Sequence, residues 1–136
     1  VLFRSLEAEA PPLIPCISKC PIKSYTEIKM VRELVDPYDV IKDVQEVLDY
    51  YGVNNNMLHG GLKLKGSVLP DTFNNNMYGY EFMGSFSFVF QLFYSEDKKH
   101  LMGVFRRLCG DVIAFNDKYR KFVELLKTKS IGEHLE

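Results

Sequence analysis

The sequence predicts an α+β protein in which two main helices pack a small antiparallel sheet, with a proline-rich N-terminal arm and a long C-terminal helix. From Phe82 to Tyr94, aromatic residues occupy alternate positions, which is typical of a strand with one buried face. Asp36-Pro37 opens one stretch with the apolar spacing of a helix, and Ser95 opens another. Because a strand and a helix joined directly pack together, we expect one shared core.

The composition fits a folded chain with no bulk electrostatic partner. The 136 residues are 46% hydrophobic and 13% aromatic, which is enough for a core. A net charge of -1 gives no general attraction to nucleic acid or to an anionic membrane, so neither is expected as a partner. The longest apolar run is far shorter than the roughly 20 residues of a membrane-spanning helix. Three cysteines are too few for a disulfide framework and favour the cytoplasm.

Three regions are expected along the chain. Residues 1–5 read as one frame of a common sequencing-adapter end and are predicted to be an artefact at the start of a fragment. Residues 6–23 carry four prolines and are predicted to form an extended arm. Leu13, Ile14 and Ile17 of this arm are expected to lie against the body or to pair at a sheet edge. Residues 24–136 are expected to form a single α+β domain.

The segment 25–35 has two interpretations. Ser24-Tyr25-Thr26-Glu27 has the form of a capping box and favours a helix over 25–35. Apolar residues at Ile28, Met30 and Leu34 also alternate with a period of two, so a strand stays open as the alternative.

The next elements follow clearer signals. Asp36 and Pro37 predict a helix that ends at Gly52, with Asp43 among the residues left to water. An asparagine- and glycine-rich connection over 54–61 then leads to a half-buried strand over 62–68. The loop 70–80 contains large apolar residues without any period and is predicted to meet a partner through Phe73, Met77, Tyr78 and Tyr80.

Apolar residues from Leu101 onward recur at steps of four and three, which predicts one helix over 95–127, bent near Gly110. In a rival interpretation a helix stops at Gly110, residues 112–115 form a short strand and Asn116 caps a last helix. The heptad pattern predicts a helix-helix contact with a partner through Phe115, Tyr119, Phe122 and Leu126. Only two strands are recognised, so a third is expected from the arm, from missing upstream sequence or from another subunit.

No motif for catalysis, a metal or a cofactor rises above background. Cys16 and Cys20 are spaced four apart, which is not the spacing of a zinc knuckle, and His59 is a further weak metal candidate. No metal, no cofactor and no catalytic residue are therefore expected. His100 and Cys109 lie too far apart on the predicted helix to act as base and nucleophile.

Residues 84–89 resemble the aromatic strand of RNA-recognition domains, in which alternate rings stack on bases. The basic and glycine lead positions of that motif are missing, and burial explains Phe86 and Phe88 more simply than base stacking does. Nucleic-acid binding is kept as an alternative function.

The expected order of elements resembles that of phage tail-terminator and minor-capsid proteins. It consists of a capped helix, an extended middle region and an aromatic strand that leads into a helix over 96–108. The resemblance implies a ring-forming subunit of the head-tail junction, located in a virion. The predicted function is thus a non-catalytic assembly or protein-binding subunit that self-associates or docks into a larger assembly. An enzyme whose site is completed by missing N-terminal sequence is the second alternative.

Overall fold

The structure is a computed structural model that describes residues 14–20, 26–58, 62–68 and 85–135. Its long elements confirm the α+β class. They are, in chain order, β1 (Thr26–Val31), α2 (Pro37–Tyr50), β2 (Asn54–Met57), β3 (Lys63–Val68), β4 (Phe86–Tyr94), β5 (His100–Gly110) and α4 (Val112–Leu126). Short 3-10 turns occupy Ile17–Lys19, Arg32–Leu34 and Gly132–His134.

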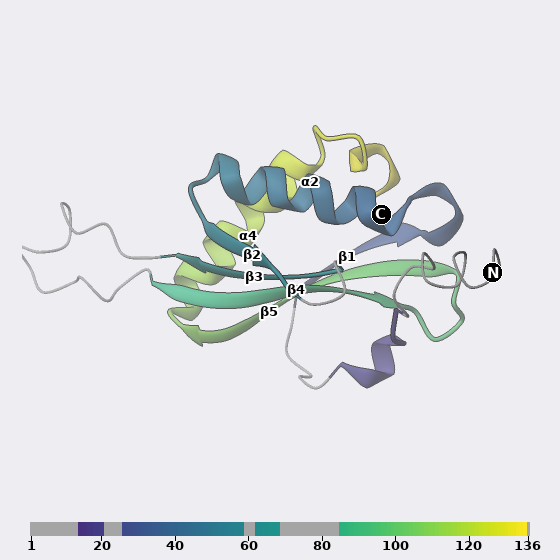
Figure 1. Cartoon of the computed structure of the whole chain (residues 1–136), viewed down its shortest axis with the longest axis horizontal. Coiled ribbons are helices and arrows are strands. Elements are labelled where there is room, and N and C mark those ends of the chain that lie inside the picture. The colour runs from purple at the N-terminus through teal and green to yellow at the C-terminus, as the bar shows by residue number, and fades with distance from the viewer. Residues whose placement is uncertain (1–13, 21–25, 59–61, 69–84, 136) are drawn as a thin grey trace, which may run out of the picture.

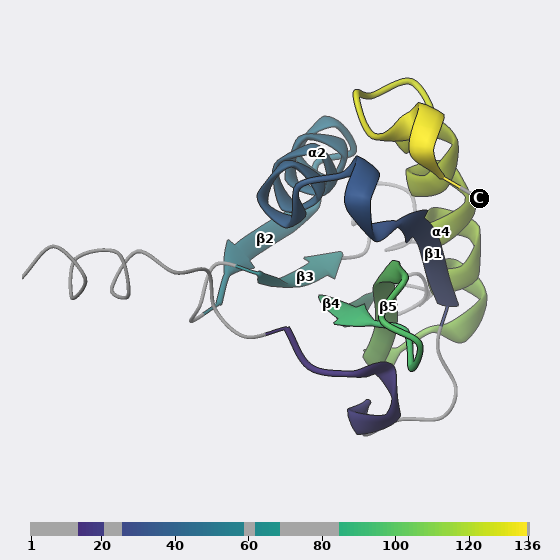
Figure 2. The ribbon, with the colours of Figure 1, turned by 90° about the vertical axis from the view of Figure 1, so that its right-hand side faces the viewer.

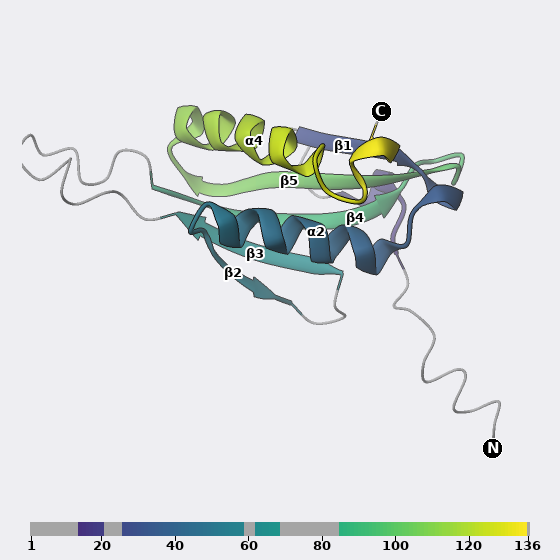
Figure 3. The same ribbon diagram turned by 90° about the horizontal axis from the view of Figure 1, so that it is seen from above.

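The five strands form one antiparallel sheet in the order β1-β5-β4-β3-β2. Strands β2 to β5 follow one another as neighbours, and β1 joins the far side of β5. The two edge strands of the sheet are therefore β1 and β2. Both long helices cover the same face of the sheet, with α2 and α4 running over it side by side (Figures 1 and 3).

The described part of the proline-rich arm lies on the opposite face from the helices (Figure 2). The backbone N–H of Tyr94 donates to the Pro15 carbonyl at 2.9 Å, and Cys16 forms a parallel bridge with Tyr94. Because the β3 ladder ends at Gln91, this contact extends the sheet at the end of β4 that β3 does not reach. The expectation that the arm packs on the body and pairs with the sheet is confirmed for these residues, and Ile14 is buried.

The aromatic side of β4 faces the helices and forms the centre of the core. Phe86, Phe88 and Phe90 are almost fully buried, and the Phe88 ring lies 6.1 Å from both the Phe105 and the Phe122 rings, measured between centroids. Glycines on the neighbouring strands make room for these rings. A Cβ on Gly103 would stand 2.7 Å from the Phe90 ring, and a Cβ on Gly66 would stand still closer to the Phe88 ring.

The helix predicted from Asp36-Pro37 is confirmed. The Asp36 carboxylate accepts from the Tyr38 N–H at 2.9 Å, and Pro37 occupies the first turn, where no donor is needed. Strand β3 also confirms the predicted strand over 62–68.

The single helix over 95–127 is wrong, because its first part is a hairpin. The Ser95 hydroxyl and the Asp97 carboxylate, which resemble a helix start, bond the backbone of a tight turn. Asp97 accepts from the Lys99 N–H at 2.9 Å, and the Ser95 oxygen accepts from the His100 N–H at 3.1 Å. Local side-chain bonds of this kind compete with helix formation, and β5 then pairs along the whole of β4.

The rival interpretation of this region is also wrong. Gly110 has the left-handed φ of 101° that favours glycine, but it ends a strand. Asp111, not Asn116, caps the last helix, since its carboxylate accepts from the N–H groups of Ile113 and Ala114 at 2.9 and 3.1 Å. Helix α4 therefore includes the residues predicted as a short strand.

Two further predictions require correction. The helix over 25–35 is wrong within the described residues, since β1 and a 3-10 turn occupy 26–34, and the open alternative of a strand is confirmed. The asparagine-rich connection includes β2, which pairs with β3 in register from Asn54 to Met57. Since β1, β2 and β5 complete the sheet, the expectation that a further strand must come from missing sequence or another subunit is wrong.

Several predictions lie outside the described residues. These are the artefact at residues 1–5, the metal candidate His59 and the partner residues Phe73, Met77, Tyr78 and Tyr80.

The position of Phe88 predicts the effect of removing its ring. Phe88→Ala should lower the free energy of unfolding by about 3 to 5 kcal/mol, because a cavity would open between the sheet and α4. Chemical denaturation measures this value, and Met57→Ala, at a side chain 48% exposed, is the control and should change it by less than about 0.5 kcal/mol. A Phe88→Ala protein of unchanged stability that had lost affinity for single-stranded RNA would support the recognition-strand alternative instead.

Candidate functional site

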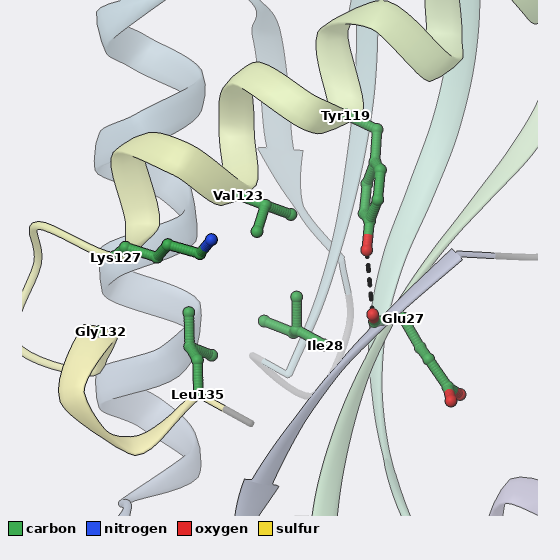
Figure 4. Close-up of a pocket in the computed structure, with 7 residues that line it drawn as sticks. All are labelled: Glu27, Ile28, Tyr119, Val123, Lys127, Gly132 and Leu135. Atoms are coloured by element: carbon green, nitrogen blue, oxygen red, sulfur yellow. Dashed lines mark hydrogen bonds between the residues drawn. The ribbon is translucent and has the colours of Figure 1, made fainter.

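A groove lies between the edge strand β1 and helix α4 and has a volume of about 580 Å³. Figure 4 shows the residues that line it. Ile28, Val123 and Leu135 form an apolar floor, the Tyr119 hydroxyl stands at one end and the Lys127 ammonium reaches in at the other. Glu27 and Gly132 complete the lining. The groove thus combines an apolar surface, a cation and the main chain of a sheet edge.

The backbone N–H and C=O groups of alternate β1 residues face this groove. On the inner side, Ile28 is registered with Gly103 and Met30 with Leu101, and the Arg32 N–H continues the ladder to the Lys99 carbonyl at 3.0 Å. Since backbone groups of successive residues point to opposite sides of a strand, the even-numbered residues face β5 and Glu27 faces outward. At the groove, the outer edge of β1 therefore offers the main-chain N–H of Glu27 to another strand, while the Glu27 carbonyl accepts from Tyr119.

Tyr119 fixes the helix against this edge. Its hydroxyl donates to the Glu27 carbonyl at 2.9 Å (Figure 4), and the Glu27 side chain points away from the groove (Figure 4). Burial of the phenol, and then the nearby Glu27 charge, raise the pKa of Tyr119. The neutral hydroxyl is the form that can donate, so both effects preserve this bond.

The C-terminal segment closes one end of the groove. Leu135, which follows the 3-10 turn Gly132–His134 in an extended conformation, forms an isolated antiparallel bridge with Met30 on the outer side of β1. The buried Asp43 carboxylate holds this segment, because it accepts from the Ser130 hydroxyl at 2.8 Å and from the Ile131 N–H at 3.1 Å. The prediction that Asp43 faces water is therefore wrong.

Lys127 is the charged group of the groove. It is exposed, and its ammonium points over the apolar floor (Figure 4). Among the residues that the structure describes, Lys127 takes part in no ion pair, whereas its neighbours Lys121 and Lys129 pair with Asp117 and Glu46. The groove can therefore offer a charge to a ligand at little cost in internal interactions.

The predicted partner residues of the last helix have different positions. Phe115, Phe122 and Leu126 are buried in the core, so the prediction that they meet a partner is wrong for these three. Residues 100–110, which the heptad pattern assigns to a helix, form β5 instead. Helix α4 follows β5 directly and packs its apolar face against the sheet. Tyr119 lies in the groove, where its hydroxyl and one side of its ring line the cavity.

The cysteines lie apart from the groove. Cys16 forms a β-bridge with Tyr94 at one end of β4. Cys109 is registered with Ser87, which lies seven residues before Tyr94 on the same strand. The two cysteines are therefore roughly 23 Å apart along β4. A hydrogen bond from Ser18 lowers the pKa of the Cys16 thiol. Over 14–20, 26–58, 62–68 and 85–135, no three ligand-type side chains gather as a metal site would require. The expectation that the chain does no metal or thiol chemistry stays a prediction.

The other sheet face contains one buried cation. Arg106 is 9% exposed, and its guanidinium lies 3.5 Å from the Gln91 side-chain oxygen. Within the described residues its Nε has no hydrogen-bond partner. Phe86, Phe88 and Phe90 are buried, and the first two lie against Phe115 and Phe122 of α4 on the opposite side of the sheet. The nucleic-acid-binding alternative stays a prediction.

The sequence pattern favours a helix over 25–35, so it does not predict the edge strand or the groove beside it. The alternation of Ile28 and Met30 was the available signal, since it placed apolar residues on one face of a strand. The pairing of Met30 with Leu135 spans about a hundred residues, and no local pattern indicates it.

Comparison with known protein families finds no family model that matches this chain, and no curated protein matches it either. No helix within the described residues is long and apolar enough to cross a membrane.

The Tyr119 hydrogen bond predicts a pH dependence. Because the folded-state pKa is raised, its contribution to stability is complete below the ordinary tyrosine value of about 10 and is lost as pH rises through the folded pKa. Tyr119→Phe should therefore make the free energy of unfolding fall less steeply between about pH 9 and 11. Denaturation series at each pH measure the slope, with Tyr50→Phe, which removes a hydroxyl from a residue 72% exposed, as the control. An unchanged slope for Tyr119→Phe would contradict this account.

Proposed function

We propose that the protein is a non-catalytic binding subunit that joins a protein partner by main-chain pairing at the outer edge of β1. The observation that carries the proposal is the combination of an edge strand, the outward-facing N–H of Glu27 and an apolar groove beside it. Strand addition of this kind takes affinity from main-chain hydrogen bonds and specificity from the neighbouring pocket.

The antiparallel bridge between Met30 and Leu135 supports the proposal, because it pairs an extended residue with the same edge of β1. Among the described residues, no strand pairs with the outer side of β1 beside Glu27 and Tyr119. Because the Tyr119 hydroxyl already holds the Glu27 carbonyl, the Glu27 N–H is the main-chain group that this part of the edge offers to a partner.

A role in a phage head-tail junction stays a finer form of this proposal. The order of elements behind that resemblance included a helix over 96–108, and β5 occupies most of this range. The confirmed helix α2 and the aromatic strand β4 are the parts of that pattern that still support it.

The proposal predicts that blocking the edge abolishes binding. Peptides selected from a displayed random library should bind the intact protein and shift the amide signals of Glu27 and its neighbours in NMR spectra. Glu27→Pro removes an outward N–H without touching the ladder to β5, and it should weaken these peptides by about tenfold, the equivalent of one main-chain hydrogen bond. Glu27→Ala keeps the N–H and is the matched control.

Two results would contradict the proposal. One is a selection that yields no binding peptide. The other is a set of peptides whose NMR shifts map to the exposed apolar residues Leu108, Val112 and Ile113 at the junction of β5 and α4, with Glu27→Pro binding them normally. The NMR map decides the question even if Glu27→Pro lowers the melting temperature.

A further inference from the structure

We infer that the β1–α4 groove selects an extended partner segment that runs antiparallel to β1, places an aliphatic side chain on the apolar floor and presents a carboxylate to Lys127. This inference rests on the proposed function and adds the chemistry of the partner.

The direction follows from the chain itself. Leu135 pairs with Met30 in the antiparallel sense, and its side chain lines the groove. A partner strand that continues the same pairing beside Glu27 therefore runs in the same direction as the C-terminal segment. Its backbone carbonyl groups then lie within reach of the outward N–H of Glu27.

The aliphatic position follows from the floor. Ile28 is 5% exposed and forms the base of the groove together with Val123. In an antiparallel pair the side chains of directly opposed residues lie on the same face of the sheet. The partner residue opposite Ile28 therefore points toward Val123 and α4, where water would otherwise cover apolar atoms. Branched aliphatic residues suit both this contact and an extended backbone.

The carboxylate follows from the charge of the groove. Lys127 supplies a cation that no described acid neutralises. Glu27, the one acidic residue among the seven described residues that line the groove, turns its side chain away (Figure 4). An acidic partner side chain at this end gains an ion pair, whereas a lysine there is repelled by Lys127. The charge therefore sets a preference between partners more than it adds affinity.

The test uses acetylated and amidated hexapeptides of alternating threonine and valine, in which each position in turn is glutamate, glutamine or lysine. Blocked ends leave glutamate as the only carboxylate. Fluorescence anisotropy should show one position at which glutamate binds about threefold more tightly than glutamine, the range expected for an exposed ion pair. Lysine at that position should bind most weakly. The glutamate preference should shrink in about 1 M salt, where charges are screened within roughly 3 Å.

Lys127→Gln should remove the glutamate preference and leave the glutamine peptide unaffected. Lys121→Gln, on the same helix but paired with Asp117, is the matched control and should keep the preference. Both lysines are exposed, so neither change should affect folding, and melting curves verify this.

The outcomes separate this inference from the proposed function. Peptides that bind at Glu27 with no difference between glutamate, glutamine and lysine would overturn the inference and leave the strand-pairing proposal intact. A preference that survives in Lys127→Gln would also overturn it. Failure of every peptide to bind would contradict both. A protein that sediments as a dimer, and becomes monomeric in Lys127→Gln, would instead identify a second copy as the occupant of the groove and contradict the inference.

Discussion

The packing of the β4 aromatic rings over glycines of the adjacent strands is the constraint on which the rest of the fold depends. The Phe88 ring lies over Gly66 on β3, and the Phe90 ring lies over Gly103 on β5, where a side chain would collide with it. The other face of β4 is buried as well, at Val89 and Phe93. A strand that buries both faces must lie inside a sheet, so β3 and β5 have to flank it. Once β5 is in place, its outer side takes up β1, and β1 becomes an edge strand with the groove beside it.

Sequence reasoning succeeded where local and tertiary preferences agree. Asp36-Pro37 caps α2 by backbone chemistry alone, and the alternation in β3 and β4 reflects burial directly. It failed at Ser95 and Asp97, because the same hydroxyl and carboxylate can cap a helix or close a hairpin turn. The spacing of Leu101 and Phe105 fits a heptad and also fits the buried face of a strand. The helix and the strand are distinguished by the pairing of this segment with β4. That pairing is a tertiary contact, which overrides the local pattern.

The candidate site was less accessible to prediction than the fold. Tyr119 was singled out as a partner residue, although for a helix-helix seam, and the structure places it in the groove with a bond to Glu27. Lys127 has no local pattern that sets it apart from other exposed lysines. The position of Leu135 depends on Asp43, a buried acid of α2 that holds the C-terminal turn. Such a site is built from contacts between distant elements, and each of its residues taken alone looks ordinary.

Amide hydrogen exchange, measured residue by residue in the free protein, tests the central claim that β1 is an edge strand with an open outer side. The account predicts slow exchange at Ile28 and Met30, whose N–H groups face β5, and exchange at least about a hundredfold faster at Glu27, whose N–H faces the groove. Equal, strong protection at Glu27 and Ile28 would show that the outer edge is already paired and would contradict the account. Fast exchange throughout β5 would contradict it as well, because β5 joins β1 to the aromatic core.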